Sequence, residues 1–178
     1  MNSNSVPAPS ATTDIIDSAV SLRAGDPVHT VRHERQKVVA STQASYEGMF
    51  AESVEGITVV ERLFVAQHAC RLSEAGSLAD HYRDRLLVAG ADPALVEAVD
   101  SAGETSLADK RLQTILAFTG KLILKPIEGD RAAIQSLVDV GLSTPAIVAL
   151  GQLIAFLSYQ IRVAAGLKAM VAATGVAA

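Results

Sequence analysis

The chain of 178 residues has only one cysteine, Cys70, no tryptophan, and an aromatic content of 4%. One cysteine cannot form a disulfide within the chain, and residues 1–13 lack the basic and apolar regions of a secretory signal. These absences favour a cytoplasmic location. Strict alternation of apolar and polar residues is also rare, whereas Leu, Ala and Val are abundant, so the composition favours helices over strands.

The chain also has no basic cluster, because its 15 Lys and Arg residues are scattered among 19 acidic ones. The formal net charge of −4 gives little attraction for nucleic acid, and no nucleic-acid partner is expected. A hydrophobic content of 49% over 178 residues is ample for the core of one domain. We expect an all-α protein.

Turn signals divide the chain into helical segments. Asp26 with Pro27, and Asp92 with Pro93, each place an N-cap before a proline at the first helical position, while Pro126 ends a helix. We expect a flexible tail at 1–13, an N-terminal helical extension over 14–52 and the main domain over 53–178. Expected helices cover about 14–22, 27–50, 57–75, 77–88, 93–99, 107–125, 131–140 and 145–167.

Residues 57–86 contain two helical runs that meet at Ala75 and Gly76, and most candidates for chemistry lie on them. Apolar residues recur at helical spacing in the first run, so one face of that helix is expected to be buried and the other to face water or a site. Cys70 belongs to the apolar face and is interpreted as a structural thiol. The apolar positions are Val60, Leu63, Phe64, Ala66 and Cys70.

Glu61 has two interpretations. Thr58 and Glu61 have the spacing of a capping box, in which each residue satisfies a backbone N–H of the other. A carboxylate in the first turn of this helix is also a candidate for acid/base chemistry. The capping interpretation is the stronger one.

His29 and His33 are four residues apart, a helical spacing that can bind a metal ion. No HExxH pattern surrounds them, and Arg32 and Arg35 lie on the same surface. A solvated basic face is therefore favoured, and no metal or other cofactor is expected.

The last apolar segment has no charged residue between Asp139 and Arg162, which raises the question of a membrane span. Gln152, Ser158 and Gln160 interrupt it, and no aromatic belt marks an interface, so a membrane span is not expected. A helix that is apolar all round is typical of the centre of a bundle or oligomer. We predict a soluble homo-oligomer.

The second half of the chain carries a family resemblance in SLADKRLQTILAFTGKL and in VDVGLSTPAIVALGQLIAFLSYQIRVAAGL. These segments resemble the last helices of the carboxymuconolactone decarboxylase and AhpD-like alkylhydroperoxidase family, and the likeness extends over about 53–167. Residues 14–50 are similar to a helical extension of peroxidase-related members. The resemblance implies an AhpD-like helical bundle that assembles as a homo-oligomer.

Thiol peroxidases of this family carry Glu-x11-Cys-x2-Cys-x3-His, in which neighbouring bases and a cysteine pair create a reducible disulfide. The resemblance places Leu63, Ala75, Leu78 and Tyr82 at these four positions. All four functional residues are therefore absent, and a Cys-x-x-Cys thiol peroxidase is not expected.

Decarboxylating members of the family do not depend on the cysteine pair and stabilise a carbanion with polar groups. By that resemblance six polar residues here could line a cavity for an anionic substrate. There are two alternatives. These residues could be ordinary surface polar residues together with one hydrogen-bonded core histidine, or the site could depend on the Cys70 thiol. The candidates are His81, Tyr82 and Glu61 as catalytic residues, and His68, Arg83 and Arg85 as substrate-binding residues.

The expected function is that of a peroxidase-related, AhpD-like protein without the redox pair, which acts on or binds a small acidic metabolite. The alternative is a non-enzymatic partner, or structural subunit, of a catalytic relative. The enzyme interpretation predicts a closed pocket lined by His68, His81, Tyr82 and an arginine. The partner interpretation predicts an exposed apolar groove.

Overall fold

The structure, a computed structural model, describes residues 14–103 and 107–175. All regular secondary structure in these residues is helical, which confirms the predicted all-α class. The predicted tail at 1–13 lies outside the described residues. The elements are α1 (Ile15–Val20), α2 (Pro27–His33), α3 (Gln36–Met49), α4 (Val59–Leu72), α5 (Gly76–Val88), α6 (Pro93–Ala102), α7 (Lys110–Leu124), the 3-10 helix η2 (Pro126–Glu128), α8 (Arg131–Asp139) and α9 (Thr144–Ala173).

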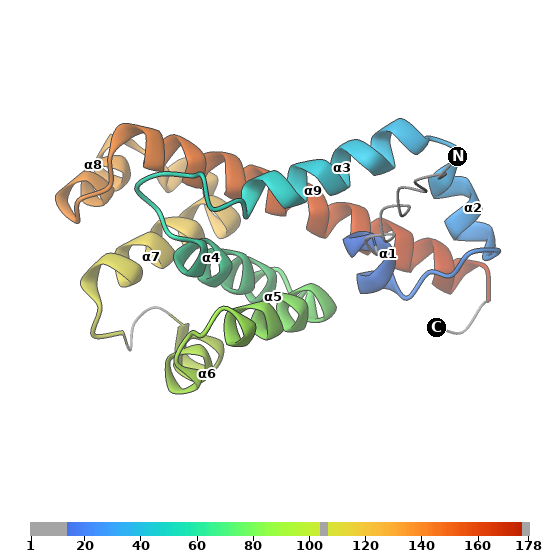
Figure 1. The fold of residues 1–178 in the computed structure, drawn as a ribbon, viewed down its shortest axis with the longest axis horizontal. Coiled ribbons are helices and arrows are strands. Elements are labelled where there is room, and N and C mark those ends of the chain that lie inside the picture. Colours follow the sequence, from blue (N-terminus) through green and yellow to red (C-terminus); the bar gives the residue numbers. More distant parts are fainter. Residues whose placement is uncertain (1–13, 104–106, 176–178) are drawn as a thin grey trace, which may run out of the picture.

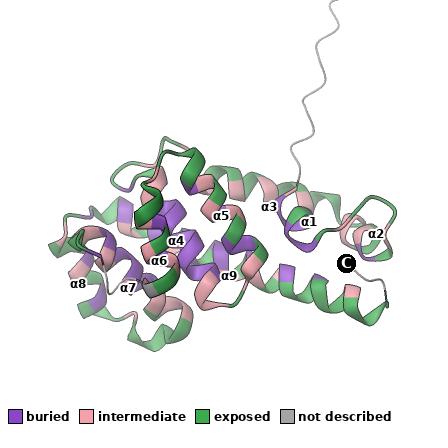
Figure 2. Cartoon of the chain, turned by 90° about the horizontal axis from the view of Figure 1, so that it is seen from below, coloured by how far each residue is buried: buried purple, intermediate pink, exposed green. Residues whose placement is uncertain are grey.

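Helix α4 lies at the centre and packs against α5, α6, α7 and α9 (Figure 1). Every residue from Arg62 to Cys70 is buried, so of the two expectations for the second face of this helix, water or a site, exposure to water is wrong. The buried part of α4 lies among its neighbouring helices (Figure 2). Gln67 donates to Asp100 of α6 at 3.2 Å, and His68 lies against α7. The polar residues Arg62, Gln67 and His68 are therefore core residues.

The helices form two parts along α9 (Figure 1). The helical body consists of α4 to α8 with residues 144–157 of α9, and the N-terminal extension consists of α1 to α3. Helices α1, α2 and α3 each contact α9, and α1 also contacts α5. The long C-terminal helix thus links the two parts.

The sequence predicts one helix over 27–50, but the structure has two. Helix α2 ends at His33, and Arg35, with φ −103° and ψ 60°, precedes α3. Arg32 and His33 bind Asp17 of α1 at 2.6 and 2.7 Å, whereas α3 runs along α9. Because the two halves are anchored to different partners, the chain bends between them.

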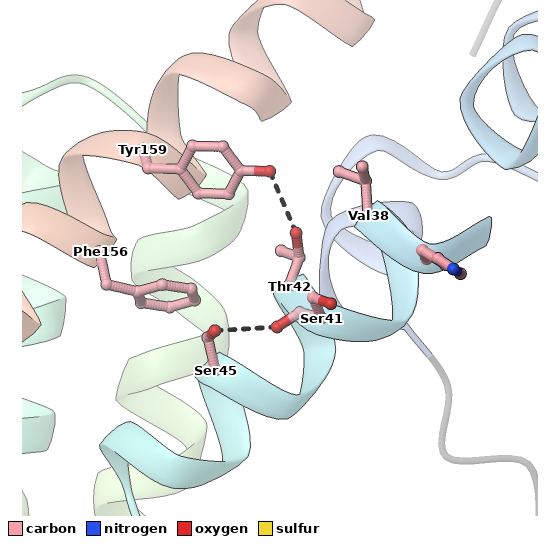
Figure 3. A pocket seen from close by; sticks show the side chains of 7 residues that line it. Val38, Ser41, Thr42, Ser45, Phe156 and Tyr159 are labelled. Atoms are coloured by element: carbon pink, nitrogen blue, oxygen red, sulfur yellow. Dashed lines mark hydrogen bonds between the residues drawn. The ribbon is translucent and has the colours of Figure 1, made fainter. Parts of the chain in front are cut away.

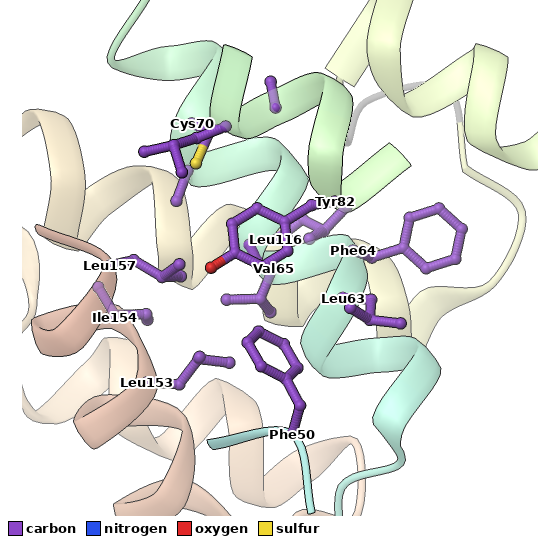
Figure 4. Packing of buried hydrophobic residues seen from close by; sticks show 14 of the residues in the cluster. Phe50, Leu63, Phe64, Val65, Cys70, Tyr82, Leu116, Leu153, Ile154 and Leu157 are labelled. Carbon is purple, nitrogen blue, oxygen red and sulfur yellow. The ribbon is translucent and has the colours of Figure 1, made fainter. Parts of the chain in front are cut away.

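The apolar core lies between α4, α5, α7 and α9, where leucine and aromatic side chains interdigitate (Figure 4). Phe64, Leu116 and Leu157 are each at most 1% exposed. Cys70 is fully buried in the same cluster. Its thiol is therefore shielded from solvent.

Helix α9 is long and apolar enough, by length and composition, to cross a membrane, and it is the one such helix among the described residues. Of its most apolar stretch, 39% is buried inside the protein. Val148 and Tyr159 remain 55% and 41% exposed. This helix therefore carries apolar surface that the chain itself does not cover.

Candidate functional site

Side chains from α3 and α5 meet in a group of three, Tyr46, His81 and Arg85, which we call the Tyr46 cluster. The Tyr46 hydroxyl lies 2.7 Å from Nε2 of His81 and accepts a hydrogen bond from Nη1 of Arg85 at 2.8 Å. The Arg85 guanidinium also lies over the ring of Phe50, 4.6 Å from its centroid, and over Tyr46 at 5.2 Å. The aromatic rings thus orient the guanidinium on one side.

The protonation of this cluster follows from its partial burial. Burial lowers the pKa of His81, and the positive charge of Arg85 lowers it further, against a smaller opposing effect of Asp84. Burial likewise raises the pKa of Tyr46, although Arg85 opposes that shift. A neutral imidazole therefore lies beside a protonated phenol at neutral pH, and the phenol O–H can donate to Nε2.

Positive charge at this site is not neutralised by an ion pair. Among the described residues, no carboxylate lies within ion-pair distance of Arg85 or of Arg62. Arg62 is 1% exposed and donates to the carbonyls of Met49 and, at 2.7 Å, Ala51, at the end of α3. Burial, and then the charge of Arg85, lower the pKa of Arg62.

Tyr82 is placed beneath the cluster and not on its surface. Its ring is fully buried, points from α5 toward α9, and packs edge-on against His81 at 5.2 Å (Figure 4). Its hydroxyl donates to Oε1 of Gln160 at 2.7 Å. Burial raises its pKa well above the ordinary range for tyrosine. Tyr82 therefore supports the cluster from inside the core.

Glu61 lies at the N-terminus of α4 and forms the predicted capping box, which is confirmed. Its Oε2 accepts from the backbone N–H of Thr58 at 2.7 Å, and its own N–H donates to the Thr58 hydroxyl. Its Oε1 accepts from Nε of Arg111 at 2.6 Å. Both carboxylate oxygens are engaged in holding the helix end.

His68 and Arg83 lie in two further places. His68 borders a hollow of about 260 Å³ against α7, together with Leu72 and Gly120, and His81 is not part of its lining. Arg83 donates to Glu97 of α6 at 3.1 Å. His68 therefore borders a different hollow from the place where His81 meets Tyr46 and Tyr82.

The resemblance assigns the glutamate and the two cysteines of the peroxidase motif to Leu63, Ala75 and Leu78, which have no ionisable side chain. Leu63 and Leu78 are 1% exposed, and Ala75 precedes the first turn of α5. Burial raises the pKa of the Cys70 thiol to about 12, with Arg71 opposing the shift. A thiol of that pKa carries almost no thiolate at neutral pH.

Two residues of the site were missed by sequence reasoning, Tyr46 and Arg62. Tyr46 and Phe50 are four residues apart and therefore share one face of α3, a signal that an aromatic pair is directed at the body. Arg62 gave no local signal, since its backbone partners come from the preceding loop.

No known family profile matches this chain, and no curated protein sequence matches it. A solved structure does: an uncharacterized peroxidase-related protein from Silicibacter sp. TM1040 superposes with a TM-score of 0.71 at 17% identity. The match covers 89% of this chain and 93% of that one. The chain thus has the fold of a peroxidase-related protein, consistent with the AhpD-like and carboxymuconolactone decarboxylase type that its sequence resembles.

Proposed function

We propose that this protein binds a small metabolite bearing a carboxylate at the Tyr46 cluster, and that it does so without dithiol peroxidase chemistry. The observation that carries the proposal is the convergence of Arg85, His81 and the Tyr46 hydroxyl at a place where no carboxylate of the described residues forms an ion pair with Arg85. A guanidinium is a planar fork of donors that matches a carboxylate. A substrate anion would supply the missing counter-charge.

The cluster also offers a route for a proton. Tyr46 lies between Arg85 and His81. When Nε2 of the neutral His81 carries the imidazole proton, it donates to the Tyr46 oxygen, so the single phenol O–H is free to donate toward an anion held by the arginine and can be replaced from Nε2. This arrangement is suited to proton transfer next to a bound carboxylate, as a decarboxylase-like reaction requires. It needs no sulfur.

Isothermal titration of succinate, benzoate and inorganic phosphate tests the proposal. Loss of a charge-assisted hydrogen bond costs about 1.5–3 kcal/mol, so Arg85→Gln should weaken binding about 10- to 100-fold. Arg83→Gln is the matched control, because Arg83 lies on the same helix but points to Glu97. Equal weakening in both variants, or no saturable binding by the native protein, would count against the site.

A groove between α3 and α9 supports a second proposal, the predicted homo-oligomer. Figure 3 shows Phe156 and Tyr159 of α9 facing Val38 and Thr42 of α3, around a hollow of about 360 Å³. The Thr42 and Tyr159 hydroxyls lie 3.0 Å apart across it. The occupant that we propose is a second copy of this chain, because the uncovered apolar surface of α9 continues along the same helix.

Sedimentation at micromolar concentration tests this assembly. We expect an oligomer for the native chain and weaker association for Val38→Glu, which places a charge in the groove. Val88→Glu is the control, since Val88 is 90% exposed at the end of α5 and outside the groove. A monodisperse native monomer, or dissociation by both variants alike, would argue against the groove as an interface.

A further inference from the structure

Three potential metal ligands meet where side chains of α1 and α2 contact each other. Nε2 of His33 lies 2.7 Å from Oδ2 of Asp17, and Nε2 of His29 lies 3.9 Å from the same oxygen. The ligand atoms of the three residues all lie within 4.8 Å of one another. The two imidazole rings stack with centroids 3.9 Å apart. The structure thus adds a carboxylate to the histidine pair.

We propose that Asp17, His29 and His33 form a binding site for a divalent transition metal ion of the zinc type. Imidazole and carboxylate ligands suit this class of ion, and three protein ligands leave a fourth position for water. Tetrahedral zinc needs its ligand atoms about 3.3 Å apart. The His33 hydrogen bond must therefore lengthen slightly and His29 must move inward, which are small side-chain adjustments.

A supporting shell already holds the carboxylate in place. Nη1 of Arg32 donates to Oδ1 of Asp17 at 2.6 Å, which leaves Oδ2 directed at the histidines. Nη2 of Arg32 donates to Asp14 at 3.1 Å. Hydrogen bonds of this kind, from a second residue to a ligating carboxylate, orient the ligand and raise metal affinity.

The charge of Arg32 does not prevent cation binding, because it is shared with Asp14. Its Nη1 also lies 3.3 Å from Nε2 of His33, so this contact must be given up when a metal ion enters. Two carboxylates and one guanidinium give the group a net charge of −1 with neutral imidazoles. A divalent ion thus enters a site of favourable sign.

The site is accessible and has a structural consequence. The side chains of Asp17, His29 and His33 are 11%, 21% and 31% exposed, so solvent reaches the histidines while the carboxylate stays shielded. Both helices contact α9. A metal ion that links α2 to α1 would therefore stabilise the packing of the N-terminal extension on the rest of the protein.

His29→Gln is the most informative variant, because at 3.9 Å His29 makes no hydrogen bond to Asp17 and its loss should leave the fold intact. We expect the native full chain to bind one Zn²⁺ by calorimetry and to give a visible absorption band with Co²⁺. His29→Gln removes one ligand and should weaken Zn²⁺ binding by at least about 10-fold, and His33→Gln should do the same. The His81→Asn control should bind Zn²⁺ like the native chain.

Thermal unfolding gives an independent measurement. Zn²⁺ should raise the midpoint of the native protein and of His81→Asn, but not that of His29→Gln, and Mg²⁺ should raise none of them. Unchanged Zn²⁺ affinity in His29→Gln, equal effects of Mg²⁺, or no saturable binding would overturn the proposal. The last result would leave the group as an ion pair between α1 and α2.

Discussion

The helical body and the N-terminal extension are held together by different forces. In the body, nine successive residues of α4 are buried, and apolar side chains of α5, α7 and α9 enclose them. In the extension, α1 is buried in the core, but α2 buries only Val28 and α3 buries only Thr42, while Arg32 and His33 bind Asp17. The body should therefore respond to core substitutions, and α2 and α3 of the extension to charge, metal ions and pH.

The Tyr46 cluster lies where the two parts meet. Tyr46 comes from the extension, whereas His81 and Arg85 come from the body. The proposed binding site is therefore complete only when α3 is seated on the body. This makes the contrast between the two parts relevant to function as well as to stability.

The largest expected difference between the parts is in thiol reactivity. With a pKa of about 12, Cys70 should react about a thousandfold more slowly than an ordinary cysteine of pKa about 8.5, and burial slows it further. A Cys70→Ser, Thr30→Cys chain, with its thiol exposed on α2, should react like free cysteine. A thiol reagent at neutral pH measures both rates, and equal rates would show that Cys70 is accessible.

The next largest effect is expected from Arg62. Arg62→Ala leaves the carbonyls of Met49 and Ala51 without their donor and opens a cavity where the buried side chain was, so it should cost about 3 kcal/mol of unfolding free energy. Arg83→Ala, at the exposed pair with Glu97, should change stability by less than about 0.5 kcal/mol. Urea unfolding gives both values. Similar costs would mean that Arg62 does not hold α3 to α4.

A smaller loss is expected at Glu61. Glu61→Ala removes the reciprocal cap and the pair with Arg111, which should cost about 1–2 kcal/mol and leave anion binding unchanged. The same urea series, combined with calorimetry, separates the two roles. Loss of binding at unchanged stability would instead return Glu61 to an acid/base role.

The smallest effect is a dependence on pH through His81. Its pKa is lowered by burial and then by Arg85, so the unfolded chain binds more protons once the pH falls below about 6.5. The contribution of neutral His81 is thus present above that pH and is lost as the pH falls through the folded pKa. The native protein should lose more stability than His81→Asn between pH 7.5 and 5.5 in thermal unfolding. Parallel curves would show that His81 is not desolvated.

The sequence predicts what local rules determine. Asp92 and Thr58 cap helices as their positions indicate, and the helical class and family resemblance agree with the structure. Spatial neighbours from distant parts of the chain were not predictable. Tyr46 meets Arg85 across 39 positions, and Tyr82 meets Gln160 across 78. The break between α2 and α3 also follows from such tertiary anchors, as does the carboxylate beside His29 and His33.

The candidate site was predicted only in part for the same reason. His81 and Arg85 are four residues apart on one helix, so their common face follows from the sequence. Arg83 lies on that same helix, α5, and His68 and Glu61 lie on α4, but these three side chains contact other partners. The homo-oligomer and the cytoplasmic location stay predictions.

The central claim is that this peroxidase-related fold functions here without sulfur chemistry. The most direct test is hydroperoxide reduction with a dithiol reductant, measured for the native protein and for Cys70→Ser. We predict no dithiol-dependent turnover above background for either protein, because the single cysteine is buried and has no resolving partner in its own chain. Robust turnover by the native protein that disappears in Cys70→Ser would contradict the account.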